Sequence, residues 1–130
     1  MFNHVMVGTN DIEKSRSFYD AVLGTLGVGE PYRHGNETGQ TRFFYRHNGG
    51  IFCITEPING ETASVGNGST IGFKCDSAEQ VNQFHDTAVA RGGVSIEDPP
   101  GERQGSLGPM HVAYVRDLDG HKLCAIYRPA

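Results

Sequence analysis

The sequence predicts an α+β domain in which two βαβββ modules form a curved, mostly antiparallel eight-stranded sheet around a cleft, with two helices outside. The prediction depends on an internal repeat and on the same order of segments in both copies. Laying residue 4 over residue 70 aligns the chain with itself for about twenty-five residues without a gap. The alignment pairs Glu13 with Glu79, Phe18 with Phe84, Asp20 with Asp86 and Gly27 with Gly93.

Each copy begins with an apolar stretch of strand length, at residues 4–7 and 70–73. Polar residues that suit a helix N-cap follow at 9–11 and 76–77. Apolar side chains then recur at helical spacing until glycines interrupt them, at Gly24 and Gly27 in the first copy and at Gly92 and Gly93 in the second. We therefore predict one amphipathic helix in each module.

Three short segments of strand character follow each helix, at 30–34, 40–46 and 51–56 and at 94–97, 111–116 and 122–127. The dipeptides Gly49-Gly50 and Asp119-Gly120 suit tight hairpin turns between the last two strands of each module. A linker at 58–68 separates modules 1–57 and 69–130. Residues 98–108, with two prolines and three glycines, predict a long loop that could act as a lid.

Length, charge and cysteine content limit the kinds of partner and the location that we expect for this chain. A chain of 130 residues is long enough for one domain with its own core. The net charge of −4 and the lack of a Lys/Arg cluster argue against nucleic acid or anionic membrane as partner, and favour a small molecule. Cys53, Cys75 and Cys124 form no CxxC pair, and no apolar run reaches membrane-spanning length. We expect reduced thiols and a cytoplasmic location.

Four segments carry a family likeness: HVMV at 4–7, DIEKS at 11–15, FYDAVLG at 18–24 and VRDLDGHKL at 115–123. With them the chain resembles, over nearly its whole length, the vicinal-oxygen-chelate superfamily of glyoxalases, bleomycin resistance proteins and extradiol dioxygenases. The resemblance implies a single glyoxalase-like domain over 1–130 and a homodimer. It also implies a small cytosolic metabolite as substrate, with a lyase reaction as one option, and a divalent metal that the substrate chelates through adjacent oxygens.

In the family pattern, each module supplies the metal with a histidine from its first strand and a glutamate from its last. His4 fits the first position, and the internal repeat places Thr70 at the equivalent position of the second module. The two glutamate positions align with Cys53 and Cys124. Of the four ligands in the family pattern, His4 alone is then present at its aligned position, so the usual divalent-metal site is incomplete.

Three interpretations of the cysteines stay open. Cys53 and Cys124 could be small buried residues in the floor of the cleft. They could instead join His4 in a thiolate site for Zn²⁺, or one of them could be a nucleophile activated by His4. A metal ion, zinc or another divalent ion, is therefore a possible cofactor.

Two further residues are candidates for the cleft. Phe44 faces opposite to Phe43 and Tyr45 by strand alternation, and His111 shares a strand face with Ala113 and Val115. The predicted ligand-binding cleft thus contains His4, Phe44, Cys53, Thr70, His111 and Cys124. Two functions remain: a glyoxalase-like or bleomycin-resistance-like protein that acts on a small metabolite, or a metal-free protein that binds or sequesters a small molecule.

Overall fold

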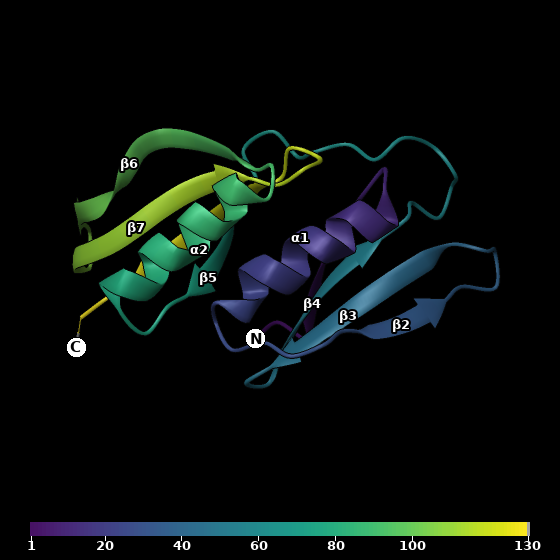
Figure 1. The fold of residues 1–130 in the computed structure, drawn as a ribbon, viewed down its shortest axis with the longest axis horizontal. Coiled ribbons are helices and arrows are strands. Elements are labelled where there is room, and N and C mark those ends of the chain that lie inside the picture. The colour runs from purple at the N-terminus through teal and green to yellow at the C-terminus, as the bar shows by residue number, and fades with distance from the viewer. Residues whose placement is uncertain (130) are drawn as a thin grey trace.

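The computed structural model describes residues 1–129 and contains two βαβββ modules in succession (Figure 1). The first module consists of β1 (His4–Gly8), α1 (Ile12–Gly24), β2 (Tyr32–Gly35), β3 (Thr41–His47) and β4 (Gly50–Thr55). The second consists of β5 (Ile71–Lys74), α2 (Ala78–Ala90), β6 (Val94–Gly105), β7 (Gly108–Arg116) and β8 (Lys122–Tyr127). The predicted α+β class and the order of elements in both modules are confirmed.

The eight strands are hydrogen-bonded as two sheets of four, in the orders β1-β4-β3-β2 and β5-β8-β7-β6. Each sheet has one parallel pair, β1 with β4 or β5 with β8, and two antiparallel pairs. The mostly antiparallel pairing expected from the sequence is therefore present. The two modules have equivalent strand orders, as expected for modules that share an internal sequence repeat.

Both helices begin where the sequence predicts a cap. The Asp11 side chain accepts a hydrogen bond from the Lys14 amide at 3.1 Å, and the Ser77 hydroxyl accepts one from the Gln80 amide at 3.1 Å. Each helix buries its apolar stripe against its own sheet, and the buried residues include Phe18, Val22, Leu23, Val81, Phe84 and Ala88. Both helices lie on the same side of the molecule (Figure 1). The other side of each sheet carries no helix, and we call it the helix-free face.

Contacts between the modules are aromatic and polar. The Phe52 and Phe73 rings meet edge to face with centroids 5.4 Å apart, and α1 packs against α2. His121 Nε2 lies 2.7 Å from the carbonyl oxygen of Gly8, which ties the β7–β8 turn to the end of β1. No helix among residues 1–129 is long and apolar enough to cross a membrane.

The prediction of a long loop at residues 98–108 is wrong. The segment is the second half of β6, which pairs with β7 and leaves a tight turn at 106–107. Pairing is interrupted between Ile96 and Gly101, where Glu97 has a left-handed φ of 61°. The two prolines lie inside this bulge, where no ladder hydrogen bond is required of them, so they do not end the strand. The segment is therefore part of a β-hairpin, and the prediction of a lid-like loop is wrong.

Candidate functional site

The helix-free face of the first sheet carries three rows of side chains that run across the strands. Strand register places each row, because residues paired across a sheet point to the same side. The middle row is Tyr32, Phe44, Cys53 and Met6. One flanking row is His34, Arg42, Thr55 and Gly8. The row on the other side is Arg46, Ile51 and His4. An apolar strip is thus bordered by basic and neutral polar groups, and no Asp or Glu occurs in these rows.

Phe44 is the centre of the apolar strip. Phe43 and Tyr45 are buried toward α1, where the Tyr45 hydroxyl donates to Asp20 at 2.7 Å, so Phe44 must point the other way. Its ring lies 6.4 Å from that of Tyr32 and 6.0 Å from that of His34, measured between centroids. Phe44 is partly buried and Tyr32 and His34 are exposed, so these rings can pack against a planar or apolar ligand.

Arg42 lies beside this strip. Its Nε is buried and has no hydrogen-bond partner among residues 1–129, and its side chain is only partly exposed. Other arginines of the described chain that lack a protein partner, Arg46, Arg91 and Arg128, are exposed to water. A buried N–H group without a partner costs free energy, about 1–3 kcal/mol in proteins. Arg42 is therefore the unsatisfied polar group of this face.

The helix-free face of the second sheet differs from that of the first in its charged groups. Its equivalent middle row is Ile96, Tyr114, Cys124 and Gly72. Lys122 forms an ion pair with Glu97 and lies 4.8 Å from the centroid of the Tyr114 ring. The position equivalent to Arg42 is Val112, which is fully buried. The cation of this sheet already has partners, in contrast to Arg42.

The six residues predicted for the cleft are divided between different surfaces. His4, Cys53 and Phe44 share the helix-free face of the first sheet. Thr70 precedes β5 and Cys124 lies on β8, both in the second module. His111 points to the opposite side, where its Nε2 lies 3.0 Å from Oδ1 of Asn82 on α2. The structure thus groups three of the six on one face and separates His111 from them.

The donors at the family's metal positions do not fit a divalent ion. His4 is exposed and its Nδ1 lies 2.8 Å from the side-chain oxygen of Asn3. Burial raises the pKa of both Cys53 and Cys124, so these thiols stay protonated near neutral pH, whereas a metal requires thiolate. Residues 1–129 contain no cluster of three or more His, Cys, Asp or Glu side chains that could hold a metal ion. We derive no chemical step through a metal here.

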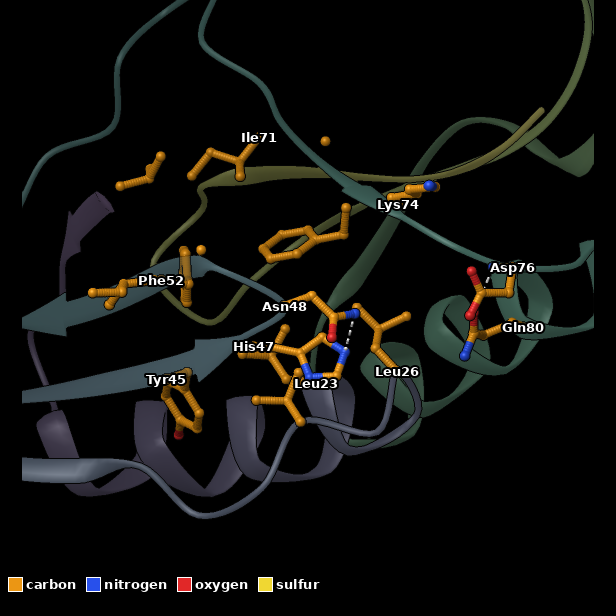
Figure 2. A pocket seen from close by; sticks show the side chains of 16 residues that line it. Leu23, Leu26, Tyr45, His47, Asn48, Phe52, Ile71, Lys74, Asp76 and Gln80 are labelled. Carbon is orange, nitrogen blue, oxygen red and sulfur yellow. Dashed lines mark hydrogen bonds between the residues drawn. The ribbon is translucent and has the colours of Figure 1, made fainter. Parts of the chain in front are cut away.

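A cavity of about 470 Å³ lies elsewhere, at the seam between the two modules (Figure 2). Its lining includes Leu23 and Leu26 from the end of α1, His47 and Asn48 from the β3–β4 turn, and Ile71, Phe73, Lys74, Asp76 and Gln80 from the second module. The volume is in the usual range for small-molecule pockets. None of the six predicted cleft residues contributes to it.

Two of the polar groups of this inter-module cavity have partners in the protein, whereas no ion pair or side-chain hydrogen bond is found for Lys74 or for the Asp76 carboxylate among residues 1–129. The Asn48 amide lies 3.1 Å from His47 Nε2, as the dashed line in Figure 2 shows. Gln80 accepts from the Asp76 amide at 2.7 Å and donates to the Thr25 carbonyl oxygen at 3.0 Å. The helix-free face, where the Nε of Arg42 is buried without a partner, is the first candidate for a ligand site, and the inter-module cavity is the second.

Sequence reasoning did not identify Arg42 or Arg46 as residues of this face. Strand alternation from Phe44 would have placed Arg42 and Arg46 on the same face as Phe44. The burial of the Arg42 Nε and the missing partner could be seen only in the folded chain.

Two βαβββ modules with both helices on one side define a protein of the vicinal-oxygen-chelate class. A family model described as the Glyoxalase/Bleomycin resistance protein/Dioxygenase superfamily matches residues 1–125, and the chain belongs to this superfamily. No curated protein matches the chain.

Solved structures agree with this assignment. A glyoxalase/bleomycin resistance protein from Albidiferax ferrireducens has 52% sequence identity and a TM-score of 0.90, and the match covers 98% of this chain and 99% of that one. A glyoxalase-related enzyme from Fulvimarina pelagi has 21% identity and a TM-score of 0.72, with 99% and 88% covered. A mutant fosfomycin resistance protein from Listeria monocytogenes, complexed with Mn(II) and 1S,2S-dihydroxypropylphosphonic acid, has 19% identity and a TM-score of 0.70, with 99% and 93% covered. The last two are similar in fold alone.

Proposed function

We propose that this chain binds a small organic molecule on the helix-free face of its first sheet, without the divalent ion that the family pattern implies. The observation that carries the proposal is the apolar row of Tyr32, Phe44, Cys53 and Met6 next to the unpartnered Arg42. Small-molecule sites are typically apolar surfaces with a few directing polar groups, and this face has that composition.

Binding without a metal is supported by the chemistry of the four family positions. A hard divalent ion prefers carboxylate oxygens, and a threonine and two protonated thiols replace the expected groups. Zn²⁺ could use thiolates, but burial opposes their formation in Cys53 and Cys124. Of the three interpretations of the cysteines, small buried residues in the site floor agree best with these surroundings.

Chemistry on the bound molecule, such as a lyase reaction on a small metabolite, stays a prediction from the resemblance. A nucleophilic cysteine requires a neighbouring base that lowers the thiol pKa, and burial raises the pKa of Cys53 instead. The homodimer and the cytoplasmic location also stay predictions. We therefore give binding, rather than catalysis, as the proposed function.

The proposal can be tested by screening small metabolites for thermal stabilisation of the protein in the presence of EDTA, because a ligand of the native state raises Tm. Phe44→Leu should reduce the shift that any hit produces, since it removes the ring at the centre of the face. Phe43→Leu is the matched control. It changes the same residue type on the opposite face of β3, so it should lower stability and leave ligand affinity unchanged.

Leu26→Phe provides a second control, because it fills part of the inter-module cavity and leaves the helix-free face intact. The proposal predicts unchanged ligand affinity in this variant. It would be contradicted if Leu26→Phe abolished binding while Phe44→Leu had no effect, which would place the ligand in the inter-module cavity.

A further inference from the structure

Arg42 differs from the other arginines in how its charge is compensated. Arg16 pairs with Asp20 and Glu30, and Arg33 pairs with Glu13. Among residues 1–129, no carboxylate lies within 4.0 Å of the Arg42 guanidinium, and no hydrogen bond from it is found. A partly desolvated guanidinium without a counter-ion is unfavourable, so its neutralising group is expected to come from outside the chain.

The immediate cross-strand neighbours of Arg42 do not cancel its charge. Its neighbours across the strands are His34 on β2 and Thr55 on β4, neither of which is acidic. Arg46 lies four residues further along the same face of β3, beyond Phe44. Glu30 lines the hollow beside Tyr32, Phe44 and Arg46 but is paired with Arg16, so no free carboxylate is found next to Arg42 among the described residues.

An apolar platform adjoins the cation. Phe44 is two residues from Arg42 on the same side of β3, and the rings of Tyr32 and His34 lie next to it. A ligand that satisfied both parts of the face would have an anionic end at Arg42 and an apolar or planar body over Phe44. Guanidinium forms its strongest hydrogen bonds with carboxylate and phosphate oxygens.

We propose that Arg42 anchors the negatively charged end of the ligand, so that the site selects small organic carboxylates or phosphates with an apolar or planar body. The inference rests on the proposed function, because it assigns a ligand class to the same face. It adds that charge, and not apolar contact alone, determines what binds.

Two matched pairs of probes test the inference: benzoate against benzamide, and phenyl phosphate against benzyl alcohol. Each is titrated into the isotope-labelled protein up to about 10 mM, since weak fragments bind with millimolar Kd, and amide chemical shifts are followed by NMR. We expect at least one of the two anions to bind, with shifts centred on β2, β3 and β4. The neutral partners should bind about tenfold more weakly or not at all, because they lack the charge-assisted hydrogen bond.

Substitutions assign the effect to one side chain. Arg42→Gln should weaken anion binding by about tenfold, and Arg42→Lys, which keeps the charge but not the planar fork, should lose less. Because Arg42 has no protein partner, neither change should unfold the chain, and Tm checks this. Arg46→Gln on the same strand should weaken anion binding less than Arg42→Gln does, and Arg91→Gln, at the residue that follows α2, is the control, with an expected change below about threefold.

Equal binding of anionic and neutral probes, binding of no probe, or an effect of Arg46→Gln larger than that of Arg42→Gln would overturn the inference. Phe44→Leu separates this failure from failure of the proposed function. If it weakens all binding probes while Arg42→Gln weakens none, the face binds ligands but not through Arg42. If Phe44→Leu has no effect on a probe that binds, the proposed site is itself wrong.

Discussion

The hydroxyl of Tyr19 in α1 donates a hydrogen bond to the carboxylate of Asp117, which lies in the turn between β7 and β8 of the other module. Both residues are buried. The second oxygen of Asp117 accepts hydrogen bonds from the amides of Asp119 at 3.0 Å and His121 at 2.9 Å. This buried polar network fixes the turn of the second module against the helix of the first.

We expect Tyr19→Phe to destabilise the protein by about 1–3 kcal/mol, because it leaves a buried carboxylate oxygen without its donor. Urea unfolding measures the change. Tyr32→Phe is the control: Tyr32 is 63% exposed, so loss of its hydroxyl should change stability by less than about 0.5 kcal/mol. Equal stability of the Tyr19 variant and the wild type would show that the hydrogen bond does not tie the modules together.

Stability should fall as the pH rises above about 10. Burial, and then the charge of Asp117, raise the pKa of Tyr19 well above its ordinary value of 10.0. A raised pKa in the folded state means that the native protein holds this proton more tightly than the unfolded chain. The resulting stability is present below the unfolded pKa and decreases at higher pH. Unfolding free energy measured from pH 8 to about 11 should show the fall, and Tyr19→Phe should make it smaller, with the part due to the buried Tyr45 remaining.

The three cysteines should react slowly with thiol reagents in the native protein. Burial raises the pKa of Cys53 and Cys124, and raises that of Cys75 to about 11. Few thiolates are present near neutral pH, and all three side chains are shielded. Iodoacetamide labelling followed by mass spectrometry at pH 7.5 should give little modification without urea and complete modification with it. Rapid native labelling of Cys53 or Cys124 would instead support a nucleophilic cysteine.

Gly120 should resist substitution because its φ is +98°, a backbone conformation that L side chains rarely adopt. We expect Gly120→Ala to cost about 1–2 kcal/mol by straining the β7–β8 turn. Gly29→Ala is the matched control, since Gly29 has no unusual φ and an added Cβ meets no atom within 4 Å. Thermal unfolding of the two variants gives the comparison, and a similar Tm for both would contradict the role of the turn geometry.

The internal repeat explains why so much of the fold could be predicted from the sequence. Phe18 and Phe84, paired by the repeat, are both buried in helices that begin at the predicted caps, Asp11 and Ser77. The loop predicted for the second half of β6 was wrong because it was inferred from composition. The prolines and glycines there are typical of a loop, but they lie in or beside a bulge of a strand. Local composition does not show which strand a segment pairs with.

The candidate site was predicted less completely than the fold. Alternation placed Phe44 opposite Phe43 and Tyr45, and the structure agrees. His111 shares a face with Ala113 and Val115 as predicted, but that face packs against α2, because small apolar residues suit a helix interface as well as a cleft. The unpaired state of Arg42 depends on every neighbouring strand, so the sequence alone could not show it.

The proposed site requires that a ligand binds to the helix-free face of the first sheet without a metal. Calorimetric titration of a ligand from the thermal screen tests it most directly, with the protein first in EDTA and then with Zn²⁺, Mn²⁺ or Ni²⁺ restored. We predict the same Kd in all four conditions and a weaker one for Phe44→Leu. Binding that is lost in EDTA, restored by one of these ions and unaffected by Phe44→Leu would contradict the claim.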